Sequence, residues 1–137
     1  QKLGLSSKAY QEWDYVLSQS GVEITNMSTG MKTMTNQIDA AKKGNEDAID
    51  RFKQLGISIS DLNNLSREDI FSKIITGFQN MEDSTSRAAL ANKIFGKSGQ
   101  ELTPLFNSTV EELKEIKQNR KRAKNQERRR KSKENAA

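Results

Sequence analysis

The sequence predicts an all-α fold of several short amphipathic helices, and three observations predict it. Apolar residues recur at intervals of three and four along most of the chain, which is the spacing of one helix face. Residues that start helices precede these stretches, and glycines follow them. No two segments carry the alternating pattern of strands that could pair in a sheet. Because only 33% of the 137 residues are hydrophobic and 30% are charged, we expect a loose bundle or an extended helical array without a large compact core.

Two segments open the chain. The first helix is expected to begin at Ser6 or Ser7, to run to about Ser20 and to stop at Gly21. Its apolar face consists of Ala9, Tyr10, Trp13, Val16 and Leu17. The next apolar residues alternate at intervals of three and four, which is the heptad seam of a helix packing lengthwise on another. The seam residues are Ile24, Met27, Met31, Met34, Ile38 and Ala41.

A shorter helix follows the break at Gly44. Asn45 is its expected cap and Gly56 its stop. Its apolar residues are Ala48, Ile49, Phe52 and Leu55. Ile57 and Ile59 then alternate with serines, which predicts a short extended piece.

The segment from residue 66 to residue 79 is expected to be helical from its first turn. Ser66 and Asp69 approach the capping-box pattern, and Leu65 with Ile70 occupies the positions of a hydrophobic staple. One apolar stripe then needs a packing partner. It consists of Ile70, Phe71, Ile74, Ile75 and Phe78.

Two further helical segments extend to residue 106. The first begins at Asp83 or the next residue and stops at Gly96. It is expected to turn inward Ala88, Ala91, Ile94 and Phe95. Ser98 and Glu101 predict a capping box for the second segment, and Pro104 limits or kinks it because proline lacks an amide hydrogen.

Composition divides the chain into a helical segment, residues 1–113, and a basic tail, residues 114–137. The tail has eleven Lys or Arg against three Glu, a net charge of +8, so the first part carries −3 of the whole-chain +5. Ser108 and Glu111 predict a capping box at the start of a stripe formed by Val110, Leu113 and Ile116. Beyond residue 117 the chain is almost entirely polar, which predicts a polar basic helix or a disordered tail that frays in isolation.

The basic tail is the strongest indication of nucleic-acid binding. Its Lys and Arg side chains could neutralise phosphates and release their counterions, so binding would be non-specific and salt-sensitive. The candidate contacts are Arg120, Lys121, Arg122, Lys124, Arg128, Arg129, Arg130 and Lys131, followed by Lys133. The tail resembles arginine-rich peptides that fold on structured RNA, but it has no aromatic residue for base stacking. A solvated charge run, or an end produced by truncation or a reading-frame change, explains the same composition.

Several kinds of chemistry are excluded by residue types. The chain has neither cysteine nor histidine, which removes disulfides, thiolate nucleophiles, the commonest zinc ligands and the usual general base. The acidic residues Asp39, Glu46, Asp47 and Asp50 are typical of a solvated face and a helix start. We therefore expect no enzymatic activity and no cofactor. No segment has the run of about 20 apolar residues that crosses a bilayer.

Two short motifs have simpler interpretations than ligand binding. Gly96, Lys97 and Ser98 match the end of a phosphate-binding loop, but its first glycine would fall at Ala91 and the segment follows a predicted helix instead of a strand. We interpret the motif as a helix stop followed by a cap. Residues 52–65 have the spacing of a DNA-binding helix-turn-helix, yet the would-be reading helix has no basic side chain, so an ordinary helix-to-helix turn is favoured.

Four phrases give the chain a family resemblance. They are AYQEWDYVL (residues 9–17), LGIS (55–58), LSREDIF (65–71) and MEDSTSRAALANKIFGKSGQELTPLF (81–106). In this order they resemble the tail tape measure proteins of long-tailed bacteriophages and prophages. The likeness covers about residues 3–113 and brings no catalytic or ligand-binding residue with it. After Phe106 the basic tail departs from the mixed-charge helix expected of the family.

The resemblance implies a long, mostly helical structural protein that fills the lumen of the tail tube and sets tube length during assembly. Its partners would be tail-tube and other tail proteins, with self-association through helices. Its location would be the virion tail, and the host cytoplasm during assembly. The chain begins at Gln1 and its first methionine is Met27, so we expect an internal segment of such a protein. The alternative hypothesis is a small helical nucleic-acid-binding protein acting through its basic tail.

Overall fold

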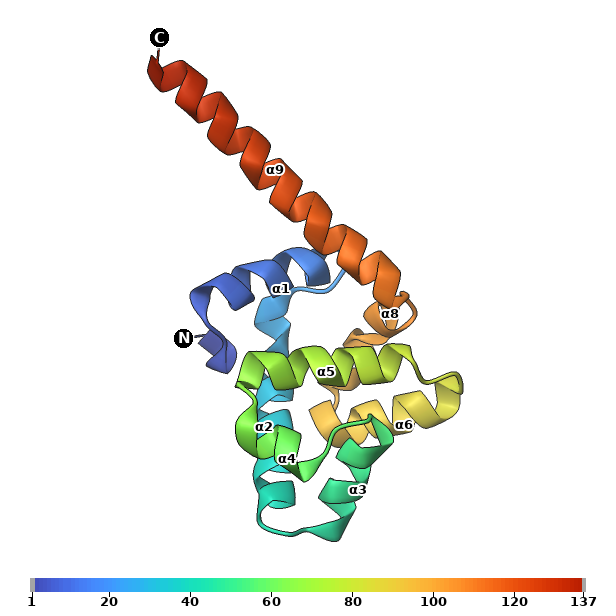
Figure 1. Cartoon of the computed structure of the whole chain (residues 1–137). Helices are drawn as coiled ribbons and strands as arrows, with labels where there is room; N and C mark the ends of the chain where they lie inside the picture. The colour runs from blue at the N-terminus through green and yellow to red at the C-terminus, as the bar shows by residue number, and fades with distance from the viewer. Residues whose placement is uncertain (1, 137) are drawn as a thin grey trace.

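The computed structural model describes residues 2–136, with the side chains of residues 3–109 and 111–133. This part of the chain contains helices and no strand, so the predicted all-α fold is confirmed. Figure 1 shows a helical body from which the last helix projects. The elements are η1 (Lys2–Gly4), α1 (Ser7–Gln19), η2 (Ile24–Met27), α2 (Ser28–Lys42), α3 (Glu46–Gln54), α4 (Ile59–Asn64), α5 (Arg67–Gln79), α6 (Ser84–Phe95), α7 (Ser98–Glu101), α8 (Thr103–Phe106) and α9 (Val110–Ala136).

Four helices begin at the residues that the sequence predicts. In each, a side-chain oxygen accepts a hydrogen bond from a backbone N–H two or three residues further on, which satisfies first-turn donors that have no partner within the helix. These caps are Ser6 for α1, Asn45 for α3, Ser66 for α5 and Asp83 for α6. Gly96 follows α6 with a φ of 66°, a conformation that glycine adopts without steric cost.

The helices pack around one hydrophobic core, so the expectation of no large compact core is wrong. The cluster draws buried side chains from α1, from the long helices α2, α5 and α6, and from Leu113 in the first turns of α9. Helix α2 packs mainly against α6 and α3, α5 packs against α8, and α1 packs against α9. The apolar stripes meet one another across the body, which explains how a chain of modest hydrophobic content still closes a core.

The heptad seam of the sequence is buried along its length. It begins in η2 and continues through α2, and Met34 at its middle is fully buried. Helix α2 contacts α3, α4 and α6, so the seam packs against several helices instead of lengthwise on one. Methionine suits such a surface because its flexible side chain fills irregular gaps.

Five aromatic rings connect the helices through the core. Trp13 of α1 meets Phe71 of α5 edge-on, with ring centroids 4.7 Å apart. Phe95 of α6 lies 6.1 Å from both Phe71 and Phe78. Phe78 in turn stacks on Phe106 of α8 at 4.6 Å. These offset and edge-on geometries are those that aromatic pairs prefer, so the rings fix the relative positions of α1, α5, α6 and α8.

The predicted extended piece around Ile57 and Ile59 is wrong, because Ile59 begins helix α4. Ser58 and Asp61 form a complete capping box: Ser58 Oγ accepts from the Asp61 N–H, and an Asp61 carboxylate oxygen accepts from the Ser58 N–H, both at 3.1 Å. Two satisfied donors stabilise even a helix of six residues. Ile57 is buried in the turn before it.

The expected capping box of Ser98 and Glu101 is also wrong. Ser98 lies inside α7, makes no cap hydrogen bond and is buried against Gly30 of α2. Packing of the small Ser98 side chain therefore replaces the predicted capping role. The segment divides at Leu102 into α7 and α8, and Pro104 occupies the first turn of α8, as a limiting proline should.

Two smaller expectations fail nearby. Thr109, not Ser108, caps α9: Thr109 Oγ1 accepts from the Glu112 N–H at 3.0 Å, whereas the Ser108 hydroxyl donates to the Pro104 carbonyl at 3.4 Å. Ala88 of α6 is exposed, and Leu90 is buried in its place. Leu90 precedes Ala91 by one residue, about 100° around the helix, so the buried face of α6 extends to the side of Leu90 and not to that of Ala88.

The basic tail is helical in its described part, so of the two predicted alternatives, a polar basic helix or a disordered tail, the structure has the helix. Helix α9 runs unbroken from Val110 to Ala136, so the change of composition at residues 113 and 114 falls inside one helix. Its 27 residues correspond to about 40 Å at a rise of about 1.5 Å per residue. In Figure 1 its C-terminal part extends away from the body.

Candidate functional site

Helix α9 is held to the body by its first turns. Leu113 is 6% exposed within the core, and Ile116 packs against its edge. One turn further, the Lys117 ammonium lies 3.4 Å from the Glu12 carboxylate and 4.6 Å from the centroid of the Trp13 ring. Both partners belong to α1. These contacts fix the rotation of α9 about its axis and thereby decide which of its basic side chains face α1.

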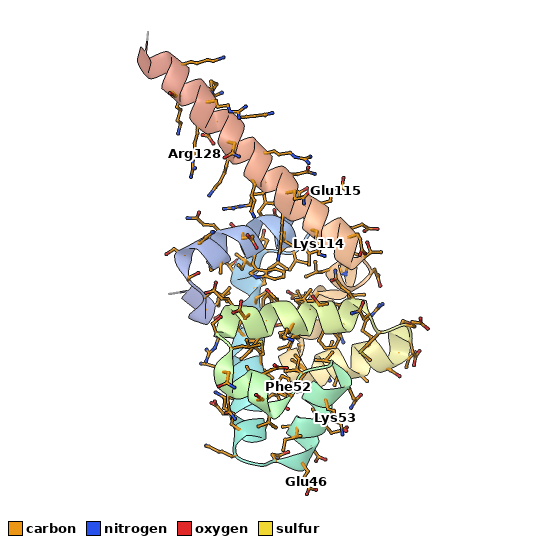
Figure 2. All side chains as sticks on the ribbon, in the orientation of Figure 1. Glu46, Phe52, Lys53, Lys114, Glu115 and Arg128 are labelled. Carbon is orange, nitrogen blue, oxygen red and sulfur yellow. The ribbon has the colours of Figure 1, made fainter. Side chains whose placement is uncertain are left out.

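The basic residues predicted to contact nucleic acid all lie on α9, and Arg120 is half-buried while the others are exposed. Four of them, Arg120, Lys121, Lys124 and Arg128, line one open groove of about 560 Å³ between α9 and the start of α1. Figure 2 shows Arg128 extending from α9 on the side of α1. The groove also contains Lys8, Gln11, Glu12 and Asn125.

The other predicted basic residues are not among those that line the groove. Arg122 donates a hydrogen bond to Asn119 at 3.4 Å, and Lys131 pairs with Glu127 at 3.5 Å on the exposed surface. Exposed pairs of this kind contribute little to stability and are screened by salt. Arg122 and Lys131 therefore remain accessible to solvent despite these contacts.

Lys8 is a groove residue that the sequence does not reveal. It lies in the first turn of α1, more than one hundred positions before Arg120, and is exposed. No local pattern connects it to the tail, because its position beside α9 depends on the packing of α9 against Trp13. Lys8 could have been identified only by predicting that α1 and α9 pack together.

The two carboxyl groups with lowered pKa values have structural explanations. Hydrogen bonds from the backbone N–H and hydroxyl of Ser58, with a smaller contribution from the charge of Lys73, hold the pKa of Asp61 below its ordinary value. Hydrogen bonds from the hydroxyl of Ser86 and from the N–H groups of Ser86 and Thr85 do the same for the pKa of Asp83. Both carboxylates cap helix starts, so neither shift indicates a catalytic acid or base.

The phosphate-loop-like motif and the helix-turn-helix-like motif both have architectural positions. Gly96 ends α6, Lys97 is exposed and Ser98 is buried, so this triplet follows a helix, as the sequence predicts. Residues 52–65 form the end of α3, a turn and α4. Phe52 is fully buried and Asp61 is engaged in a cap, which fits the ordinary turn favoured from the sequence.

Within the described side chains, no group of three or more acidic residues is placed to hold a metal ion. Over the same part of the chain, none of the helices combines the length and apolar character needed to cross a membrane. The chain matches no known protein family, no curated protein and no solved structure.

Proposed function

We propose that this chain is a non-enzymatic structural segment of a tail tape measure protein from a long-tailed bacteriophage or prophage. It would act through helix packing inside the tail tube, with tail-tube proteins and other copies as partners, in the virion tail and beforehand in the host cytoplasm. The proposal depends on what the residues of the family-like phrases do in the fold. Arg87, Ser98 and Gly99, all in the longest phrase, make contacts between helices, as an architectural role requires.

Arg87, within the longest phrase, joins three elements. Its guanidinium donates to the carbonyls of Met81 and Phe106, at 3.5 and 3.4 Å, and to the side-chain oxygen of Asn107 at 2.6 Å. A planar guanidinium with five N–H donors can satisfy several acceptors at once. Arg87 thereby ties the loop before α6 to the end of α8.

Small residues in the phrases allow close helix contacts. A Cβ atom at Gly99 would lie 2.5 Å from the carbonyl oxygen of Ala91, so α7 can approach the end of α6 only with glycine there. The hydrogen of Gly30 similarly leaves space for Ser98, which is 8% exposed. Ser98 and Gly99, within the sequence GKSG (residues 96–99), therefore serve helix-to-helix packing.

The folded body changes what the ruler hypothesis predicts. A continuous helix of 137 residues would span about 200 Å at about 1.5 Å per residue, whereas the longest helix here has 27 residues. We therefore propose that the segment acts as a folded module before the tail closes around it. In the assembled tube its helices would lie end to end and pack on the tube wall and on other copies, because chain length sets tube length only when the helices are extended.

The test is an in-frame deletion of residues 3–113 from the phage gene that encodes them, with tail length measured by electron microscopy. Tails should shorten by about 1.5 Å per deleted residue, which is about 170 Å. A second strain that duplicates the segment should lengthen its tails by the same amount. Normal tail length in both strains would refute the ruler function.

A second candidate function is binding to nucleic acid through α9, which we propose on the strength of one observation. In the described part of α9 beyond Lys117, nine basic side chains accompany a single acidic one, Glu127. Titration of labelled duplex DNA and hairpin RNA at two salt concentrations tests it. Salt-dependent binding that disappears when residues 118–137 are deleted supports this candidate, and its absence from the intact chain removes it.

A further inference from the structure

The groove between α1 and α9 has an excess of positive charge that the protein itself leaves uncompensated. Its walls bring together five basic side chains, Lys8, Arg120, Lys121, Lys124 and Arg128. Glu12 is the acidic residue that lines it, and its carboxylate is already paired with Lys117 at 3.4 Å. Five like charges around an open groove of about 560 Å³ create a local positive potential that attracts and retains anions.

The basic side chains of α9 continue this charge in a regular stripe. Its members follow at intervals of four and three residues, which places them on one helix face. The stripe consists of Lys117, Lys121, Lys124, Arg128 and Lys131. Because Lys117 is fixed over Trp13, the stripe is directed toward α1 where it passes the body and continues beyond it.

A regularly spaced row of cations is suited to a partner with regularly spaced anions. We propose that the groove binds one phosphodiester strand of duplex DNA, and that Lys8 supplies a phosphate contact from the body opposite those of α9. This inference rests on the second candidate function and adds a folded, two-sided site to it. The remaining basic residues of α9 would meet the other strand while the helix lies in the major groove.

The chemistry of α9 favours duplex DNA over other polyanions. Insertion into a membrane surface as an amphipathic helix would require an apolar helix face, and Ala123 is the sole apolar residue between positions 118 and 133. Single strands are usually held by aromatic stacking, and this stretch has no aromatic side chain. The B-form major groove, about 12 Å wide, admits an α-helix, whereas the A-form major groove of RNA is too deep and narrow.

The experiment compares Lys8→Gln with Lys53→Gln in the full chain. Both residues are exposed lysines near the start or end of a body helix, and Lys53 lies on α3 at the far end from α9 (Figure 2). Binding to a labelled 20-base-pair duplex is followed by fluorescence anisotropy between about 50 and 200 mM salt. Circular dichroism of each variant checks that helix content is unchanged.

For Lys8→Gln we expect an affinity about five- to tenfold lower at about 100 mM salt and a log–log salt slope smaller by about 0.9, the values for one lost phosphate contact. Lys8→Arg should restore both values, and Lys53→Gln should match the wild type. Equal binding by Lys8→Gln and Lys53→Gln, with the wild type still binding through α9, overturns the two-sided groove and leaves the second candidate function standing.

Three further outcomes also decide the proposal. Failure of the wild-type chain to bind any nucleic acid overturns both the groove and the second candidate function. Tighter, Lys8-dependent binding of hairpin RNA overturns the assignment to duplex DNA. Equally effective competition by poly-glutamate shows a site that responds to negative charge alone and overturns recognition of a phosphodiester strand.

Discussion

The ammonium group of Lys117 lies over the indole ring of Trp13, with Nζ 4.6 Å from the ring centroid. The same indole is 2% exposed and meets Phe71 edge-on from within the core. Trp13 is therefore the point at which the charged helix α9 and the aromatic core of the body touch the same side chain. The position of α9 depends on this contact and on the ion pair between Lys117 and Glu12.

Replacing Lys117 with Gln should weaken the attachment of α9 to the body. The variant loses the cation–π contact and the ion pair, and the free energy of unfolding should fall by about 1 kcal/mol. Trp13 is the single tryptophan of the chain, so its fluorescence reports this contact directly and should change in the folded state. Urea unfolding followed by that fluorescence measures both effects.

Lys114→Gln is the matched control, because Lys114 is an exposed lysine one turn earlier on the same helix. It should leave both the emission of Trp13 and the free energy of unfolding close to their wild-type values. Equal effects of the two substitutions would mean that general charge on α9, and not the Lys117 contact, is responsible.

Gly30 and Ser98 should behave as a coupled pair. A Cβ atom at position 30 would lie 2.7 Å from the Cβ of Ser98, so Gly30→Ala should destabilise the protein by about 1–3 kcal/mol despite the better helix propensity of alanine. Adding Ser98→Gly removes the clashing side chain. In a double-mutant cycle measured by urea unfolding, the double variant should be more stable than the sum of the single effects by about 1 kcal/mol. Strict additivity of the two single effects would show that positions 30 and 98 do not interact.

Local signals in the sequence predict much of this fold. Ser6, Asn45, Ser66 and Asp83 start their helices where expected, because an N-cap is a contact between residues two or three positions apart. The stripe in α5 is buried as predicted for the same reason: helical periodicity is visible in consecutive residues.

Several of the errors come from contacts that are distant in sequence. Ser98 has the local signature of a cap, but the approach of α7 to Gly30 buries it. The seam from Ile24 to Ala41 gives no indication that it would meet several helices. At the candidate site, the four basic groove residues of α9 could be predicted from composition, whereas Lys8 joins them only through tertiary packing.

Asp83 should make the stability of α6 depend on acidity. Hydrogen bonds from Ser86 and Thr85 hold the pKa of Asp83 below its ordinary value in the folded protein. The unfolded chain therefore binds the proton more readily, so this stabilisation is present above about pH 4, the ordinary range for Asp, and is lost as pH falls through the lower folded-state pKa.

Asp83→Asn keeps a capping oxygen and removes the titration. Its melting temperature should lie below that of the wild type at pH 7, and the difference should shrink as pH falls below about 4. Asp39→Asn, at an exposed position within α2, is the control for loss of one negative charge. A difference between Asp83→Asn and wild type that stays constant over this pH range would contradict the assignment.

Truncations of α9 should separate its anchoring part from its projecting part. Removing residues 121–137 takes away a mostly charged stretch whose described side chains, at residues 121–133, are all exposed, and the free energy of unfolding should change by no more than about 0.5 kcal/mol. Removing residues 113–137 also deletes Leu113, which is 6% exposed, and Lys117. This longer deletion should cost at least about 2–5 kcal/mol, the range for a lost buried leucine.

Urea unfolding monitored by Trp13 fluorescence measures both truncations in one assay. The anchoring part of α9 then includes residues on either side of the compositional change at positions 113 and 114, because Leu113 and Lys117 contact the body from the same helix. If the shorter truncation destabilises the body as much as the longer one, the residues beyond Arg120 must stabilise it. In that case residues 121–137 of the basic tail would be part of the folding unit and not an appended binding element.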